Sequence, residues 1–473
     1  MSQKALGLFD ITSLVVGSII GADIYVAASF GSGLLGPAAL AAWVVAGFLA
    51  VLIALAFAQC AMVAPRVGGS YAYAREAFGN FPGFLVGWSL WLAEWTSLAV
   101  FPIAFTRYLG VFFPHLSFWE TTSLKVLFVL FLTVVNYVGT RAAGKVNDFL
   151  TLAKLGPLLL FSLLGIAYLA WNPLLAAKNF IPFAPLGWKG FGPALVAIFW
   201  AYAGFELAAI PAGEVKDPRR TIPVAIIRGI GVVIIFYLVT NFVILGTLPW
   251  KILARASAPL TDAFRAMALD VAPALSGAAA IIMALGAVIS ISGSDESGTF
   301  GTSRLAYAMA VDGHLPKIFG RLHPRYGTPY VSLLFQNTTA LFAAIYGNIG
   351  GLIKVAVFCL GLAYLVTALA ALRLRRRHPD ARLRVPFTRW IPYLAAAASL
   401  FLITQVSRKE LLLGAGLVLL GVPLYLFFSP REKIGELHKQ LLSESFRLER
   451  LSRYSERFLA HALKHLWGRD PLK

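Results

Sequence analysis

Long apolar runs dominate the chain, and the short segments between them collect most of its charges. Runs of about 20 apolar residues match the thickness of a bilayer when they are helical, whereas the alternating strands of an outer-membrane barrel are shorter. We therefore predict an all-α integral membrane protein with twelve transmembrane helices. The predicted spans cover residues 8–31, 37–63, 83–113, 122–141, 148–171, 192–212, 222–248, 274–301, 328–347, 350–373, 387–406 and 410–429.

Two of these runs are interrupted in the middle by glycine and a carboxylate. They are residues 16–23, VGSIIGAD, in the first span, and residues 199–206, FWAYAGFE, in the sixth. Unwound backbone is tolerated at membrane depth only where protein or a water-filled cavity surrounds it. Broken helices at corresponding places in two halves of a chain indicate the binding site of a transporter. The first five spans and the next five would form these halves, each starting with a discontinuous helix, as inverted-topology repeats do.

Composition supports the membrane class. Of the 473 residues, 59% are hydrophobic and only 13% are charged, and the mean hydropathy is +0.75. Soluble proteins are usually about a quarter charged. The first apolar run is too long and too interrupted by glycine to be a cleavable signal peptide. The two cysteines, Cys60 and Cys359, lie in apolar spans, where we expect small buried thiols.

The net charge of +19 is distributed unevenly. Basic residues crowd the loops after spans two, four, six, eight and ten, and the intervening loops are poorer. The basic loops contain Arg66 and Arg75; Arg141 and Lys145; Lys216, Arg219, Arg220 and Arg228; Arg304, Lys317, Arg321 and Arg325; and Arg373, Arg375, Arg376, Arg377, Arg382, Arg384 and Arg389. This alternation is the positive-inside signal. It predicts a multi-pass protein of the cell membrane with both termini in the cytoplasm, in contact with anionic inner-leaflet lipid and not with nucleic acid.

The segment after Pro430 differs in character from the apolar spans. Apolar residues recur in it at roughly helical spacing among Arg, Lys and Glu. This pattern is typical of a basic amphipathic helix. Such a helix would lie on the inner leaflet or on the protein's own loops, or it would make a regulatory or oligomeric contact.

Four segments, in order over roughly the first 330 residues, carry further motifs. They are GSIIGADIY at 17–25; PRVGGSYAY at 65–73 with AFG at 77–79; GFE at 204–206 with GEVKDPRRTIP at 213–223; and a series from SR at 303–304 to YGTP at 326–329. With these motifs the chain resembles the amino acid–polyamine–organocation superfamily of permeases. The resemblance implies ten core helices in two inverted repeats, two peripheral helices, alternating access, and an amino acid or amine substrate.

The resemblance also implies a division of the chain. Residues 1–373 would form the transport core, with repeats at about 1–171 and 192–373. Residues 386–429 would form the two peripheral helices, and residues 430–473 the cytoplasmic tail.

The chemistry of a broken helix suits a zwitterion. The break frees N–H groups that attract a carboxylate and C=O groups that attract an ammonium group. By similarity to the family, the N–H groups come from Gly21, Ala22 and Asp23, and the carbonyls from Ile19, Trp200 and Ala203, with Gly204 beside them. Trp200 is either an aromatic gate, as in the family's arginine exchangers, or a core-packing residue.

Coupling to protons is implied for one lysine. In proton-using members of the family a lysine in the fifth span bridges spans one and eight, and Lys154 stands at the matching place. Burial disfavours a charged ammonium group, so such a lysine can release a proton. The alternative is a lysine that snorkels from near the cytoplasmic end of the span. We expect Ser292 to approach Lys154. Glu206 matches a glutamate implicated in proton response, or it makes a structural hydrogen bond.

Two departures from the family pattern affect the substrate. Asp23 stands where glycine is usual, and Asp295 and Glu296 stand where small or neutral residues are commoner. Each uncompensated charge at the bilayer centre costs at least about 2.5–3.5 kcal/mol, so partners or protonation are required. Ser292 and Glu296 share a helical face, so if Ser292 faces Lys154 then Glu296 faces the cavity.

These acids have two interpretations. Asp295 pairs with Lys154, or Asp23 and Glu296 make the cavity acidic and select a cationic substrate. That substrate would be a basic amino acid, a polyamine or another organic amine.

Other function classes fit less well. An intramembrane enzyme needs a nucleophile with a base, or metal ligands, at membrane depth. The seven histidines fall in loops, near span ends or in the tail, and the sequence contains neither HExxH nor CxxC. The sequence also lacks the ring-forming filter motif that a channel would need. We predict a secondary transporter of an amino acid, coupled to protons, with no cofactor or metal; the alternatives are a carrier of polyamines or other organic amines, and a transporter-like nutrient sensor.

Overall fold

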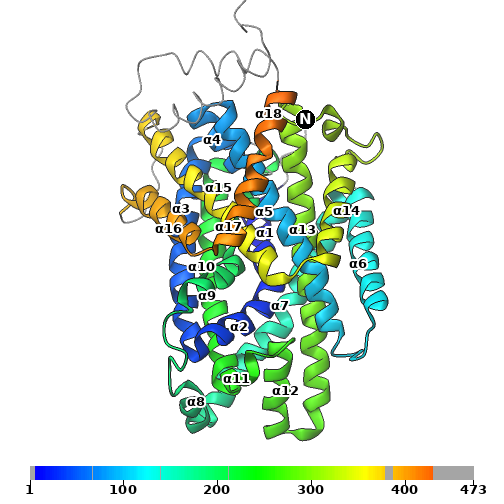
Figure 1. Cartoon of the computed structure of the whole chain (residues 1–473), viewed down its shortest axis with the longest axis vertical. Helices are drawn as coiled ribbons and strands as arrows, with labels where there is room; N and C mark the ends of the chain where they lie inside the picture. Colours follow the sequence, from blue (N-terminus) through cyan, green and yellow to red (C-terminus); the bar gives the residue numbers. More distant parts are fainter. Residues whose placement is uncertain (1–5, 67, 139, 211, 379–386, 430–473) are drawn as a thin grey trace, which may run out of the picture.

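The structure of the protein is a computed structural model that describes residues 6–66, 68–138, 140–210, 212–378 and 387–429. Within these ranges the chain is helical, and extended pairing is limited to one isolated bridge between Leu6 and Val215. Most of the helices run along the long axis of the molecule (Figure 1). An all-α fold is thus confirmed for the described residues.

The α-helices vary widely in length. They are α1 (Leu8–Ile19), α2 (Ala22–Leu35), α3 (Ala39–Val63), α4 (Ser70–Phe78), α5 (Asn80–Leu109), α6 (Phe118–Val138), α7 (Thr140–Trp171), α8 (Pro173–Phe180), α9 (Phe191–Phe199), α10 (Pro218–Thr247), α11 (Trp250–Leu253), α12 (Pro259–Val271), α13 (Ser276–Val311), α14 (Tyr330–Tyr346), α15 (Ile349–Arg377), α16 (Ile391–Thr404), α17 (Arg408–Leu419) and α18 (Gly421–Phe428). Short 3₁₀ segments are η1 (Gly36–Ala38), η2 (Trp200–Tyr202), η3 (Phe205–Ala209), η4 (Ala212–Glu214), η5 (Pro273–Leu275) and η6 (Lys317–Gly320).

Every predicted span overlaps a helical segment, but the lengths differ from the prediction. Among the described residues, nine stretches are long and apolar enough to cross a membrane, and the first of them, Leu8–Val63, contains α1, α2 and α3. Helix α14 has 17 residues and α16 only 14, at or below the length of a straight crossing. The protein is a multi-pass membrane protein, while the count of twelve crossings remains a prediction. The predicted tail at 430–473 lies outside the described residues.

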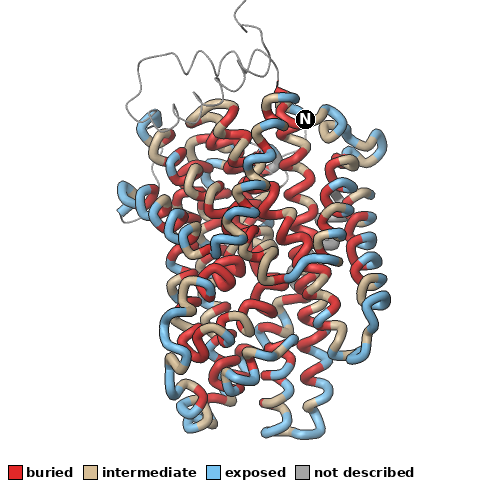
Figure 2. Tube along the Cα trace, viewed as in Figure 1, coloured by how far each residue is buried: buried red, intermediate tan, exposed pale blue. Residues whose placement is uncertain are grey.

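The interrupted segments lie at the centre of the bundle. Helix α1 packs against α7, α10, α13 and η3, and α2 packs against α9. Buried residues concentrate along these central elements (Figure 2). Far less of α6 and of the α17–α18 segment is buried. The core is therefore built around the two breaks that the sequence predicts.

Large apolar side chains cover the outer faces of the bundle. Phe131, Leu163, Ile235 and Leu412, on four different helices, are each more than half exposed. Exposed apolar surface of this extent is rare on soluble monomers, but it suits contact with acyl chains.

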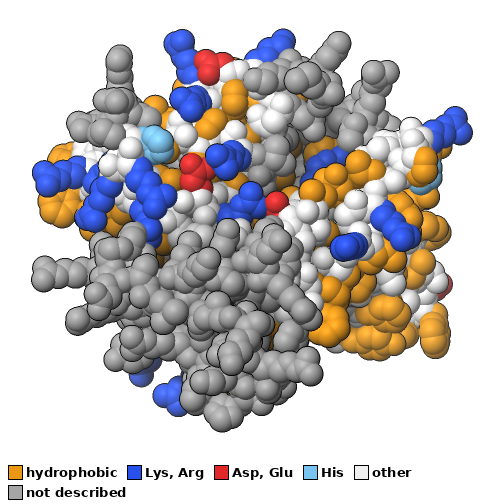
Figure 3. All heavy atoms as spheres, turned by 90° about the horizontal axis from the view of Figure 1, so that it is seen from above, with side chains coloured by type: hydrophobic (Ala, Val, Ile, Leu, Met, Phe, Trp, Pro, Cys, Tyr) orange, Lys and Arg blue, Asp and Glu red, His pale blue; other side chains and the backbone are white. Residues whose placement is uncertain are grey.

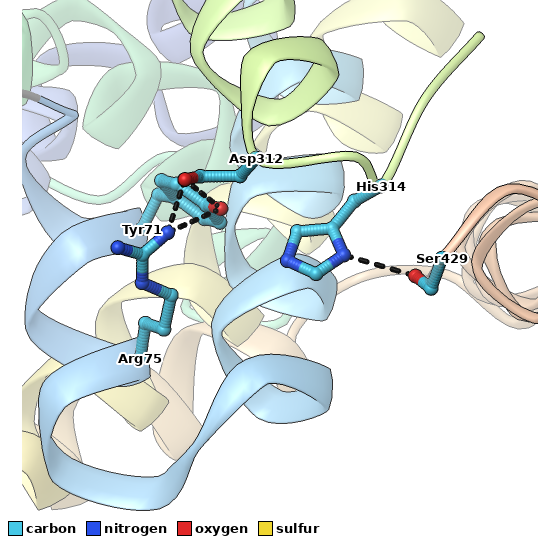
Figure 4. A network of polar contacts seen from close by, with 5 residues as sticks. All are labelled: Tyr71, Arg75, Asp312, His314 and Ser429. Atoms are coloured by element: carbon cyan, nitrogen blue, oxygen red, sulfur yellow. Dashed lines mark hydrogen bonds and ion pairs between the residues drawn. The ribbon is translucent and has the colours of Figure 1, made fainter. Parts of the chain in front are cut away.

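Polar contacts join distant parts of the chain at the end of the molecule where α4 and α18 lie (Figure 4). Arg75 on α4 forms an ion pair with Asp312, which follows α13. The Tyr71 hydroxyl donates to the same carboxylate at 2.6 Å. The buried His314 ring shares a hydrogen bond of 2.9 Å with Ser429, just after α18. These contacts tie α4, the end of α13 and the end of α18 together.

Candidate functional site

The first interruption separates α1 from α2. Ile20 is extended (φ −76°, ψ 100°), so α1 ends at Ile19 and α2 begins at Ala22. Glycine is required at position 21 by close packing, because a Cβ there would lie 2.3 Å from the Ser294 Oγ. The break frees carbonyl groups at the end of α1 and N–H groups at the start of α2.

The carbonyl end of this break binds side chains from α7 and α13. Lys154 is fully buried, and its Nζ donates to the carbonyl oxygens of Gly17 and Ile20, the latter at 2.7 Å. The Ser294 Oγ donates to the same two oxygens, at 3.2 and 2.9 Å respectively. A lysine in this position does not snorkel to the membrane surface, so that alternative is wrong. Lys154 instead links α7 to the broken end of α1.

The N–H end of the break holds the carboxylate of Asp23. The Gly21 N–H donates to Asp23 Oδ1 at 2.7 Å. The Tyr237 hydroxyl, from α10, lies 3.3 Å from Asp23 Oδ2 and 2.9 Å from the Ile19 carbonyl oxygen. Asp23 is only 5% exposed. The carboxylate therefore spans the gap between the two half-helices.

The second interruption follows α9. The chain passes through η2 to an extended Ala203 and then to Gly204, whose φ of 122° favours glycine, before it enters η3. A Cβ on Gly204 would lie 2.9 Å from the backbone carbon and oxygen of Ser18. The Ser18 Oγ donates to the Gly204 carbonyl at 3.0 Å. The two breaks therefore touch one another.

Both breaks border one cavity of about 30 Å³. Its lining consists of Ser18, Asp23, Glu94, Ser97, Phe101, Trp200, Ala203, Gly204, Leu207, Ser294, Gly298 and Leu360. The Trp200 Nε1–H donates to the Ser97 Oγ at 2.9 Å, and its ring centroid lies 6.2 Å from that of Phe101. This volume holds about two water molecules. A larger ligand therefore requires the lining to move apart.

Comparison with known proteins gives the family. Residues 6–416 match the family model described as amino acid permease. The chain belongs to the amino acid permease family. The resemblance to the amino acid–polyamine–organocation superfamily is thus confirmed, and the family consists of transporters, not of enzymes.

Relatives of this permease cover most of its length. The chain is 26% identical to the methylthioribose transporter of Bacillus subtilis (strain 168), over 91% of this chain and 94% of the relative. It is 28% identical to the serine/threonine exchanger SteT of the same organism, over 89% of this chain and 96% of the relative. It is 30% identical to the human large neutral amino acids transporter small subunit 2, over 89% of this chain and 80% of the relative.

Four of the predicted substrate residues of this permease line the cavity, namely Asp23, Trp200, Ala203 and Gly204. The other residues of the first break, Ile19, Gly21 and Ala22, are buried beside it but are not among its lining. The Trp200 carbonyl oxygen accepts the Ala203 N–H at 3.1 Å, which closes a turn within the second break.

At the second break of the permease, two acidic side chains, Glu206 and Glu94, lie beside one another. Glu206 is fully buried, and its Oε2 accepts the Gly204 N–H at 3.0 Å. Its carboxyl group also interacts with the side chains of Glu94 on α5 and Tyr364 on α15. Since Glu94 lines the cavity, this carboxyl pair connects the cavity to the broken end of the sixth predicted span.

The predicted rotation of α13 is wrong. The Ser292 Oγ donates to the Val288 carbonyl within its own helix at 2.8 Å, and Ser294, not Ser292, meets the carbonyl groups that bind Lys154. Two residues correspond to about 200° around an α-helix, so the Ser292 side chain points away from these carbonyl groups, whereas Glu296 lies near Lys154.

The two acids of α13 also lie elsewhere than predicted. Asp295 is 3.4 Å from Thr299 Oγ1, and within the described residues it makes no ion pair with Lys154. Glu296 is close enough to Lys154 for an electrostatic interaction but does not line the cavity. Helix α13 faces the cavity with Ser294 and Gly298.

Sequence reasoning missed Glu94, Ser97 and Tyr237. For Glu94 a signal was available, because an ionisable residue in the middle of an apolar span is a functional candidate by default. Ser97 and Tyr237 offer no comparable signal, since hydroxyl groups in spans commonly bond to their own helix. Their partners, Trp200 and Asp23, come from distant elements.

Proposed function

We propose that this permease is a secondary active transporter that carries an amino acid, or a chemically related organic amine, across the cell membrane by alternating access coupled to protons. The observation that carries the proposal is the direct contact of two broken helices around one small cavity. The relatives named as a serine/threonine exchanger and a large neutral amino acids transporter support an amino acid as the substrate.

Substrate binding would use the polar groups freed by the breaks. The carbonyl groups near Ile19, Trp200 and Ala203 suit an ammonium group, and the N–H groups at the start of α2 suit an anion. Trp200 would close over the substrate, because its ring and that of Phe101 both line the cavity.

Proton coupling would run through Lys154. When charged, the ammonium group binds two carbonyl oxygens of α1 and thereby holds the break against α7 and α13. Loss of its proton would weaken both bonds and release α1, because charge-assisted hydrogen bonds are about twice as strong as neutral ones. Glu206, with Glu94 beside it, would be a second proton site. Ser292 and Asp295 bond within α13 and are assigned no such role.

Alternating access would involve two inverted repeats, at about 1–171 and 192–373, with residues 386–429 at the periphery. The distribution of Lys and Arg indicates how the protein is oriented in the membrane. Lys and Arg side chains gather at the end of the molecule shown in Figure 3. This basic end, together with the alternation of basic loops along the sequence, supports a cytoplasmic location for that end and for both termini.

The experiment is uptake by purified protein in liposomes with an imposed pH gradient. We expect accumulation of a labelled substrate that the gradient increases, and in the Lys154→Ala variant the gradient should lose its effect. Lys125→Ala is the matched control, because Lys125 is also buried and also donates to a helix carbonyl, that of Ala344 at 2.9 Å, away from the breaks. Binding without any flux would indicate a sensor, and uptake indifferent to the gradient would remove the proton role.

A further inference from the structure

The anion-binding end of the first break is already occupied by a carboxyl group. Breaks of this kind present N–H groups that suit the carboxylate of an amino acid. Here the Gly21 N–H donates to the side chain of Asp23, two residues further on, at 2.7 Å. The backbone N–H groups of Asp23 and Ile24 also contact this carboxylate. The protein thus supplies from its own chain the group that an amino acid would bring.

Asp23 is fixed in this position. Its second oxygen lies 3.3 Å from the Tyr237 hydroxyl, which is itself anchored to the Ile19 carbonyl at 2.9 Å. The side chain is only 5% exposed, and the cavity that it borders has a volume of about 30 Å³. A substrate carboxylate would have to displace Asp23 or lie against it, and two adjacent buried carboxylates cannot both ionise cheaply.

The charge of the cavity points in the same direction. Its lining contains two acids, Asp23 and Glu94, and within the described residues it contains no Lys, Arg or His. Lys154 interacts electrostatically with Asp23 but lies behind the break, on the carbonyls of Gly17 and Ile20, and is not part of the lining. A zwitterion brings no net positive charge to such a site, whereas an ammonium compound does.

The aromatic wall of the cavity also suits a cation. Phe101 on α5 and Trp200 in η2 both line it, and the Trp200 N–H donates a hydrogen bond to Ser97. Aromatic ring faces attract ammonium groups, most strongly when water is excluded, as in this small cavity.

We propose that this permease selects a small organic cation that has an ammonium group and no carboxylate, and that Asp23 takes the place of the missing substrate carboxylate. The ammonium group would bind between Asp23 and the carbonyl groups of the breaks, with Glu94 and Trp200 on the opposite side. This specificity rests on the proposed transport function and narrows it to amines.

The test compares substrates that differ only by the carboxylate. Putrescine and ornithine form one such pair, and ethanolamine and serine form another. Each compound is added to the purified protein, and the shift of its thermal unfolding midpoint is measured, followed by competition for uptake into liposomes. We expect the amine of each pair to bind at least about tenfold more tightly than its amino acid.

Substitution of Asp23 provides the second arm. In Asp23→Gly the N–H groups of the break become free, so the preference should reverse in favour of the amino acid. Asp23→Asn keeps the size of the side chain and should lose amine binding without such a gain. Asp270→Asn is the control, since Asp270 is exposed on α12 and accepts a hydrogen bond from Tyr168, far from the breaks.

The two proposals are separated by the results. If wild-type protein binds and transports the amino acids as well as or better than the amines, the inference about Asp23 is overturned while the transport function stands. If neither class binds or moves, the transport function falls and this inference with it. Should the Asp23 variants fail to fold, the paired compounds on wild-type protein still decide the question.

Discussion

Gly204 is a residue at which the two broken helices contact one another. Its φ of 122° is one that L side chains rarely adopt, and a Cβ would meet the backbone of Ser18 at 2.9 Å. We predict that Gly204→Ala lowers the free energy of unfolding by at least about 1–3 kcal/mol and abolishes uptake. The thermal unfolding midpoint in detergent and liposome uptake measure the two effects.

Gly231 on α10 provides the matched control for this substitution. It has ordinary helical backbone, and among the described residues no neighbouring element comes within 4 Å of the place that a Cβ would occupy. Alanine is favoured over glycine inside a helix by about 0.8–1.0 kcal/mol, so Gly231→Ala should leave stability unchanged or raise it slightly. Equal behaviour of the two variants would mean that the breaks do not need to touch.

Single residues were predictable from the sequence where the backbone interruption itself is the structural feature. Gly21, Asp23 and Gly204 belong to short glycine-containing interruptions, and an interruption at membrane depth is informative without knowledge of its neighbours. The partners of these residues were not predictable. Tyr237 and Ser97 contact the breaks only because α10 and α5 are packed there, and nothing local in their sequences distinguishes them.

At the scale of the element, the rotation of α13 decides which side chain helps to hold the first break. The Ser294 Oγ donates to the carbonyls of Gly17 and Ile20, whereas the Ser292 Oγ bonds within its own helix. We predict that Ser294→Ala destabilises the protein by about 1 kcal/mol, since one hydroxyl proton is shared between the two oxygens, and reduces gradient-driven uptake severalfold. Ser292→Ala should change stability by less than about 0.5 kcal/mol.

Uptake and thermal unfolding measured side by side on these two variants test the rotation directly. The opposite ranking, with Ser292→Ala the more damaging, would restore the rotation predicted from the sequence. The sequence could not fix this rotation, because residues 292–299 of α13 are small or polar on every face and leave no apolar stripe to indicate the core side.

At the scale of the molecule, the positions of the apolar runs predicted the helices well, since length and hydropathy alone identify membrane segments. The spatial neighbours of each helix were not predictable in this way. The contact of α4 with the end of α13 joins residues more than 200 positions apart, through the Arg75–Asp312 ion pair and the Tyr71–Asp312 hydrogen bond at one end of the bundle. Only the packed structure brings these residues together.

This ion pair gives a prediction about access to the central cavity. An engineered cysteine, Ser97→Cys, would report on access, because the native Cys60 and Cys359 are both buried. Removing the pair with Arg75→Gln and Asp312→Asn should speed labelling by a membrane-impermeant thiol reagent from that end. Partly exposed pairs contribute up to about 1 kcal/mol, so the increase should be at most about fivefold.

The two substitutions should act non-additively if the pair is what holds this end closed, because each alone already breaks the ion pair. Arg66→Gln is the control at the same end, since Arg66 forms a more exposed pair, at 3.3 Å, with Glu76 of α4. Labelling faster in the control than in the double variant would show that net basic charge, and not the link between α4 and α13, governs access. Labelling unchanged in every variant would mean that the end of the molecule opens without breaking this contact, so the closing elements would have to be the two broken helices themselves.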